Sequence, residues 1–135
     1  GGHKHRMALD DMVMIKDNHL LVCNSIEDII KKARKRHKHV EVEVENQKDA
    51  ILAANCGATI VMLDNFSPVQ IKKTITALQK KKLRNKVKLE ASGRIGSKNI
   101  AEYAKTGVDI ISVGSITNSV TGLDLSLEVC VSPKK

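Results

Sequence analysis

The feature that most constrains the fold of this chain is a set of five short apolar runs. Each run ends in a polar residue or a glycine. The five endings are Ile15-Lys16, Val42-Glu43, Leu63-Asp64, Ala91-Ser92-Gly93 and Val113-Gly114. About 20 to 30 residues separate one ending from the next, enough for one strand, one helix and two loops. Such βα units place all strand C-termini at one edge of a parallel sheet, where α/β sheets and barrels bind ligands. The repeat therefore predicts the location of a site.

The spacing predicts the element order βαβαβαβαβ followed by one terminal element. Strands are expected at 12–15, 40–45, 58–63, 86–91 and 108–113. Helices are expected from Asn24 or Ser25 to about Arg36, over 49–56, from Ser67 to about Lys82 and from Ser97 to Lys105. A short helical turn should follow Gly114, and 123–131 is strand or helix. Residues 1–135 read as a single α/β domain, either most of a parallel barrel or a small open sheet, because five strands cannot close an eight-stranded barrel.

The segment Val40–Glu45 alternates valine with glutamate, which predicts a strand with an apolar face and an acidic face. A central parallel strand is normally apolar on both faces, so one interpretation is an edge strand with a wet face. The other is a barrel or cleft strand whose acidic face lines a ligand site. This segment by itself leaves both interpretations open.

The net charge of +8 favours an anionic partner. Aromatic residues make up only 1% of the chain, which removes the stacking platforms that single-stranded nucleic acids require. Small phosphates are therefore the more attractive anions. The basic run 31–39 has the composition of a nucleic-acid patch, but cations at a helix C-terminus also complement the helix dipole, and a solvated helix end is the favoured interpretation.

No apolar run reaches the roughly 18 residues of a membrane span, and 1–6 lacks the apolar core of a secretory signal. Because the sequence does not begin with Met, we expect a piece of a longer chain or a processed one. The cysteines Cys23, Cys56 and Cys130 are odd in number and form no CxxC pair, which favours a reduced, cytoplasmic protein over a structural zinc site.

Two strand endings have the composition of a phosphate site. Ser92-Gly93 and Gly114-Ser115 put small residues where a strand is expected to meet a helix N-terminus, with its unpaired N–H groups and positive dipole. Barrels commonly bind phosphate on the loops after their last two strands. One such glycine alone is equally consistent with ordinary turn chemistry, whereas a pair on successive units is more specific.

Charged side chains mark the other endings. Early in the chain, His5, Arg6 and Lys16 are suited to a carboxylate or phosphate. Glu43 and Asp64 lie on successive strand ends, where two carboxylates can hold sugar hydroxyls, bind Mg²⁺ or stabilise a developing positive charge. Together these groups predict a sugar phosphate that meets an anionic partner.

The chain closely resembles the C-terminal part of the quinolinate phosphoribosyltransferases, also called nicotinate-nucleotide pyrophosphorylases. The runs IKDNH, MLDN and EASG are the most specific. The resembling segments, in family order, are 1–6, 14–19, 41–44, 62–66, 89–93, 107–114 and 123–127.

The resemblance implies an N-terminal sandwich domain followed by an open α/β barrel of the type II phosphoribosyltransferase kind. It also implies transfer of the phosphoribosyl group from phosphoribosyl pyrophosphate to quinolinate with Mg²⁺, giving nicotinate mononucleotide, pyrophosphate and CO₂ for NAD biosynthesis. A homodimer or higher homo-oligomer is expected, without membrane or nucleic-acid partners.

The family pattern also assigns roles to residues. His5, Arg6 and Lys16 would contact the quinolinate carboxylates, and Glu43 and Asp64 would hold the ribose hydroxyls or, directly or indirectly, Mg²⁺. Lys16, Glu43 and Asp64 are the expected catalytic residues. The cradle of the 5′-phosphate would consist of Ser92, Gly93, Arg94 and Gly114.

The chain departs from the family pattern in three ways. Arg94 stands where a second glycine is usual, and Asn118 stands where many members have histidine. The chain also begins inside the family's glycine-rich GGGxxHR segment. The resemblance therefore implies that the sandwich domain and the first barrel strands, with their arginine and lysine substrate contacts, lie outside this segment. It also implies an arginine contributed by the N-terminal domain of a dimer partner. We expect the 135 residues alone to be inactive.

Two alternatives remain at this stage. One is a paralogue that uses the same barrel on another anionic acceptor, such as the molybdenum-transport-associated relative, which assays with quinolinate and related acids would distinguish. The other is a non-catalytic phosphate- or nucleic-acid-binding module. Salt-dependent binding of duplex DNA that is unaffected by Lys16→Ala and Asp64→Ala would favour such a binding module.

Overall fold

The strands form one parallel sheet in strictly sequential order. The computed structural model describes residues 12–16 and 25–116. Within them the strands are β1 (Val13–Ile15), β2 (Val40–Val44), β3 (Ile60–Asp64), β4 (Lys88–Ser92) and β5 (Ile110–Ile111), paired in the order β1-β2-β3-β4-β5. Every pairing is parallel. The α/β class and the βα order are therefore confirmed, and the open sheet is compatible with part of a barrel.

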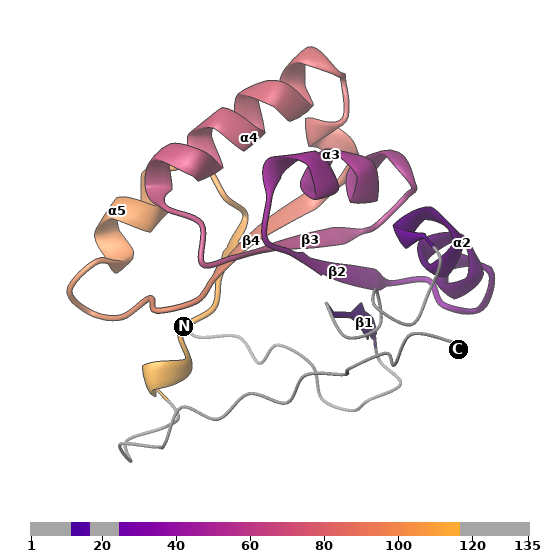
Figure 1. Cartoon of the computed structure of the whole chain (residues 1–135). Coiled ribbons are helices and arrows are strands. Elements are labelled where there is room, and N and C mark those ends of the chain that lie inside the picture. The colour runs from indigo at the N-terminus through magenta and orange to yellow at the C-terminus, as the bar shows by residue number, and fades with distance from the viewer. Residues whose placement is uncertain (1–11, 17–24, 117–135) are drawn as a thin grey trace, which may run out of the picture.

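Helices connect successive strands. They are α2 (Ile26–Arg36), α3 (Gln47–Asn55), α4 (Pro68–Lys80) and α5 (Ile100–Ala104), with short 3₁₀ turns η1 (Arg84–Lys86) and η2 (Gly114–Ile116). In Figure 1, α3 and α4 lie along one side of the sheet, with α2 and α5 towards its two ends. None of the described helices is long and apolar enough to cross a membrane.

The core lies between these helices and one face of the sheet. The three valines of β2 are at most 3% exposed and belong to one cluster with Leu63, Leu89 and the helix residues Ile30 and Ile71. Because side chains alternate along a strand, the glutamates of β2 point to the other face. The valine–glutamate alternation thus separates the packed face from a polar face.

Local signals explain where the helices begin. Ser25 Oγ accepts a hydrogen bond from Asp28 N at 3.1 Å, and Asn46 Oδ1 accepts one from Asp49 N at 3.0 Å. Ser67 forms a full capping box, in which its Oγ accepts from Gln70 N and its N donates to Gln70 Oε1. These bonds satisfy backbone donors that the first turn of a helix leaves free.

Three expectations were wrong in detail. Ser97 does not cap a helix, because residues 97–99 form a turn and α5 begins only at Ile100. The last described strand is limited to two residues rather than 108–113. The edge-strand interpretation of 40–45 is also wrong, because β2 pairs with both β1 and β3.

Candidate active site at the C-terminal edge of the sheet

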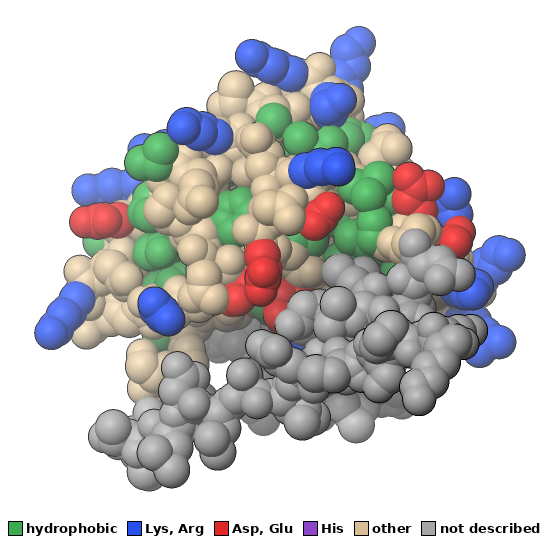
Figure 2. Space-filling model, viewed as in Figure 1, with side chains coloured by type: hydrophobic (Ala, Val, Ile, Leu, Met, Phe, Trp, Pro, Cys, Tyr) green, Lys and Arg blue, Asp and Glu red, His purple; other side chains and the backbone are tan. Residues whose placement is uncertain are grey.

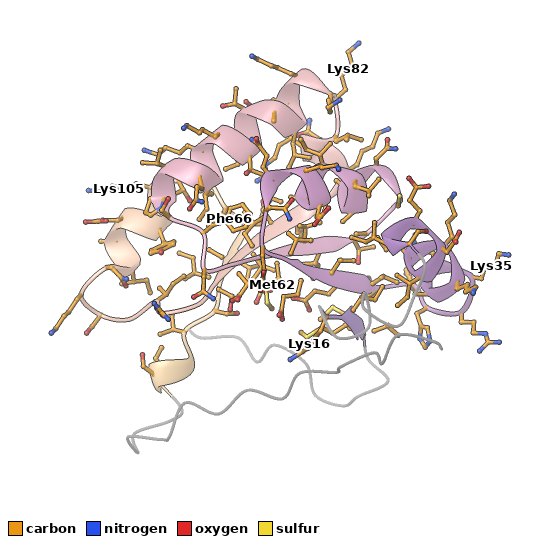
Figure 3. All side chains as sticks on the ribbon, in the orientation of Figure 1. Lys16, Lys35, Met62, Phe66, Lys82 and Lys105 are labelled. Carbon is orange, nitrogen blue, oxygen red and sulfur yellow. The ribbon has the colours of Figure 1, made fainter. Side chains whose placement is uncertain are left out.

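The polar face of the sheet carries a row of candidate site residues. Glu43 pairs with Met62, and Met62 pairs with Glu90, so these residues stand side by side on β2, β3 and β4. One step further along, Asp64 pairs with Ser92. Since paired residues of parallel strands point to the same side, all five side chains share one face. Figure 3 shows Met62 near the middle of the sheet.

Two fully buried carboxylates accompany the expected pair. Glu41 and Glu90 are both 0% exposed, whereas Glu43 and Asp64 are partly exposed. Ser112 Oγ donates a hydrogen bond to Glu90 Oε1. In Figure 2 the most prominent group of acidic side chains lies near the centre of the described surface, with Lys and Arg around its margin.

Sequence reasoning singled out Glu43 and Asp64 but missed Glu41 and Glu90. A signal was available for Glu90, which is the only acid inside an otherwise apolar strand segment, Leu89–Ala91. Burying a carboxylate costs free energy unless the group is hydrogen-bonded, so an acid at such a position is a candidate for the site. For Glu41 the alternation itself was the signal.

The residue after Asp64 closes the end of β3. Asn65 has a φ of +54°, and its Nδ2 donates to Asp64 Oδ2 at 2.6 Å. Its backbone N donates to Ser92 O at 3.0 Å, which continues the β3–β4 ladder past Asp64. The sequence motif included Asn65, but no role for it was recognised.

The phosphate-type turns lie next to one another. A Cβ built on Gly96 would lie 3.5 Å from Ser115 Oγ, so the loop after β4 contacts the turn that starts at Gly114. The structure thus brings together the two segments that the sequence pattern paired. One correction is needed: α5 begins seven residues after Gly93, so only Gly114 stands directly at the start of a helical turn, the short η2.

Arg94 occupies an exposed position with a φ of +52°, a conformation that glycine adopts more easily. Asn99 holds the loop around it, since its Nδ2 donates to Arg94 O at 3.1 Å and its Oδ1 accepts from Gly96 N at 2.9 Å. The arginine therefore does not prevent the turn from forming, and its side chain is left at the surface.

Lys16 follows β1 at the same edge. Ile15 pairs with Val42, so continuation of this register sets Lys16 beside Glu43. Lys16 is exposed, and Figure 3 shows it on the polar side of the sheet. His5, Arg6 and Asn118 lie outside the described residues.

Glu43 and Asp64 supply the oxygen donors that Mg²⁺ prefers. The described residues contain no group of three or more His, Cys, Asp or Glu side chains that could hold a metal ion. Mg²⁺ usually keeps several waters and binds one or two carboxylates together with substrate phosphates. The two partly exposed carboxylates fit that mode of binding.

The one described cysteine does not belong to this site. Cys56 caps the C-terminus of α3, which lies at the opposite edge of the sheet because the helix runs back against the strands. Burial raises the pKa of the Cys56 thiol, and the Glu27 carboxylate acts in the same direction. Both effects disfavour the thiolate, which is the nucleophilic form of cysteine.

Known proteins share both the sequence and the fold. The family described as "Quinolinate phosphoribosyl transferase, C-terminal domain" matches residues 1–128. The probable nicotinate-nucleotide pyrophosphorylase [carboxylating] of Methanothermobacter thermautotrophicus is 50% identical over 132 residues, which cover 96% of this chain and 47% of that protein. Its counterpart in Archaeoglobus fulgidus is 46% identical over 129 residues, covering 96% and 50%.

A solved structure of a relative has a similar fold. The nicotinate-nucleotide pyrophosphorylase of Francisella tularensis superposes with a TM-score of 0.78 at 44% identity, over 87% of this chain and 41% of that one. The chain thus spans about half the length of the relatives it matches. On these matches, this chain belongs to the quinolinate phosphoribosyltransferase family and corresponds to its C-terminal domain.

Proposed function

We propose that the full-length protein transfers the phosphoribosyl group of phosphoribosyl pyrophosphate to quinolinate. The products would be nicotinate mononucleotide, pyrophosphate and CO₂, as a step of NAD biosynthesis. The observation that carries this proposal is the C-terminal edge of the sheet, where Asp64 pairs with Ser92 at the Gly93 turn, on the same face as Glu43. The loop that follows this turn contacts the turn starting at Gly114 through Gly96 and Ser115. Family membership and this arrangement support the same substrate, a ribose that bears a 5′-phosphate.

The reaction builds positive charge at the anomeric carbon of the ribose as its bond to pyrophosphate breaks. Ionised Glu43 and Asp64 would accept hydrogen bonds from the ribose hydroxyls and place negative charge close to that carbon. The turns at Ser92-Gly93 and Gly114, with Arg94 at their margin, would hold the 5′-phosphate. Fixing the ribose at both ends is a positioning effect, which we expect to outweigh acid–base chemistry.

Mg²⁺ is the cofactor that the two carboxylates are suited to hold. When bound, it would supply positive charge that favours departure of pyrophosphate. Glu43 and Asp64 would position it, directly or through water.

The acceptor side of the proposal rests on Lys16. Lys16, with His5 and Arg6, would bind the quinolinate carboxylates and aim the pyridine nitrogen at the anomeric carbon. Bond formation makes that nitrogen cationic, and the ring then accepts the electron pair released when the adjacent carboxylate leaves as CO₂. A proton from water replaces the carboxylate on the ring.

The remaining expectations concern the whole protein. We propose a cytoplasmic homodimer or higher homo-oligomer whose further substrate contacts come from outside this chain. These 135 residues alone would then be inactive, and robust formation of nicotinate mononucleotide by the purified chain would contradict this expectation.

The decisive experiment replaces Lys16 with alanine in the full-length protein. We expect kcat/KM for quinolinate to fall at least about tenfold, which corresponds to about 1.4 kcal/mol of lost transition-state stabilisation. The matched control is Lys35→Ala, which removes an exposed lysine on α2 and should leave kcat/KM unchanged. An unchanged value for Lys16→Ala would remove Lys16 from the site.

A parallel assay with related pyridine and benzene carboxylic acids tests the acceptor. Turnover of quinolinate alone supports the proposal. Turnover of another acid, with none of quinolinate, would show a paralogue that uses the same barrel on a different acceptor.

A further inference from the structure

We propose that Asn65 is a positioning residue that locks the ribose-binding carboxylate of Asp64 to the phosphate-binding turn at Gly93. The inference rests on the proposed function and deepens it. It assigns to one side chain the alignment of two subsites that bind different ends of the same ligand, a ribose with a 5′-phosphate.

Asn65 forms hydrogen bonds to residues of two neighbouring strands. Its Nδ2 donates to Asp64 Oδ2 at 2.6 Å, which restricts rotation of the carboxylate. Its backbone N donates to Ser92 O at 3.0 Å, so the same residue is tied to the start of the phosphate turn. Asn65 thereby fixes the position of the Asp64 carboxylate on β3 relative to the Ser92 carbonyl on β4.

Asn65 also packs closely against Gly93. A Cβ built on Gly93 would lie 2.4 Å from Asn65 Oδ1, 2.7 Å from its Cγ and 2.8 Å from its N. Only a glycine fits against the Asn65 side chain, so the amide touches the turn on one side while it bonds Asp64 on the other. A shift of the amide would move both subsites.

The backbone conformation at position 65 also favours asparagine. Asn65 has a φ of +54°, a region that asparagine tolerates better than most residues with a side chain. Asparagine is therefore suited to this position, because it accepts the turn and supplies an amide donor. Aspartate would accept the turn equally well but would set a second carboxylate against Asp64.

The test compares two ligands in the full-length protein with Mg²⁺ present. Ribose 5-phosphate spans both subsites, whereas inorganic phosphate occupies only the turn. In Asn65→Gly, which eases the backbone and removes the amide, we expect the Kd of ribose 5-phosphate to rise at least about tenfold and that of phosphate to change less than about threefold. Asn65→Asp should show the same selective loss.

A matched control is available in Lys82→Gly. Lys82 has a φ of +57° and is exposed, and Figure 3 shows it beyond the far end of α4, so it tests the backbone change alone. We expect both dissociation constants to match those of the unaltered protein. A rise in the Kd of ribose 5-phosphate in this variant would overturn the interpretation of Asn65→Gly.

The outcomes separate this inference from the proposed function. Equal losses for both ligands in Asn65→Gly would show a merely structural role, and no loss for either would show no role. If Asp64→Asn weakens ribose 5-phosphate binding while Asn65→Gly does not, only the inference fails. If neither variant affects it, the proposed function of Asp64 fails as well.

Discussion

Two features of the structure favour glycine at position 93, namely its backbone conformation and its close contact with Asn65. Its φ is +88°, and an added Cβ would overlap Asn65, whereas Gly57 has a φ of +93° with open space around it. Comparing the two glycines therefore separates strain of the left-handed backbone from steric overlap.

We expect Gly57→Ala to lower the free energy of unfolding by about 1 kcal/mol, the ordinary cost of a left-handed alanine. Gly93→Ala should lower it by at least about 1 kcal/mol more, because overpacking adds to the strain. Urea unfolding measures both values. Equal losses would contradict the close contact between Gly93 and Asn65.

The buried glutamates also belong to the residue scale. Glu90 is fully buried and accepts a hydrogen bond from Ser112, one strand away. Glu41 is equally buried on the same face of the sheet. Burying a carboxylate costs free energy unless the group is hydrogen-bonded, and the bond from Ser112 supplies one such partner for Glu90.

At the scale of elements, the helix starts show which serines act as caps. Ser67 and Ser97 both precede helical sequence, but only Ser67 forms a capping box. In α5 the Asn99 side chain bonds backward to the 94–96 loop instead. The 94–96 loop thus engages the side chain that could otherwise cap the helix.

Replacing these serines tests that difference. Ser67→Ala should lower the free energy of unfolding by about 1 kcal/mol, because Gln70 N loses its side-chain acceptor. Ser97→Ala is the control. Because Ser97 is an exposed residue in a turn, this substitution should change the free energy of unfolding by less than about 0.5 kcal/mol. Thermal or urea denaturation compares them, and a larger loss for Ser97→Ala would contradict the observed start of α5.

At the scale of the whole molecule, the two edges of the sheet have different tasks. The C-terminal edge carries the candidate site residues, while an ion pair between Arg84 and Asp109 lies at the N-terminal edge. Arg84 Nη2 lies 2.9 Å from Asp109 Oδ2 and donates to Gly107 O at 3.0 Å. Asp109 Oδ2 also accepts from Leu89 N at 2.7 Å, which joins β4 to the start of β5.

Arg84→Ala should therefore affect stability and leave binding unchanged. We expect the free energy of unfolding to fall by about 1–3 kcal/mol, because several charge-assisted hydrogen bonds of a partly buried pair are lost. The control is Lys31→Ala, whose exposed pair with Glu27 at 3.7 Å should contribute less than about 0.5 kcal/mol. A changed Kd for ribose 5-phosphate in folded Arg84→Ala would contradict the separation of the two edges.

Much of the fold follows from local pattern. The caps at Ser25 and Ser67, the glycine at 57 and the apolar runs predicted elements that the structure contains, with boundaries shifted by a few residues. The prediction failed where tertiary contacts override local signals. Asn99 turns towards Arg94 rather than α5. The alternation at 40–45 left an edge strand and an inner strand both open, and only the pairing of β2 with β1 and β3 decided between them.

The sequence by itself determined the βα order, and with it the edge of the sheet at which the candidate residues Lys16, Glu43 and Asp64 lie. These follow from periodicity and chain order, which act over short distances along the chain. Only the tertiary structure decided that Glu90 joins their row and that Asn65 lies between Asp64 and Gly93. Those relations depend on strand register and on contacts between separate βα units. Sequence spacing does not encode them, because packing of the units against one another sets which residues meet.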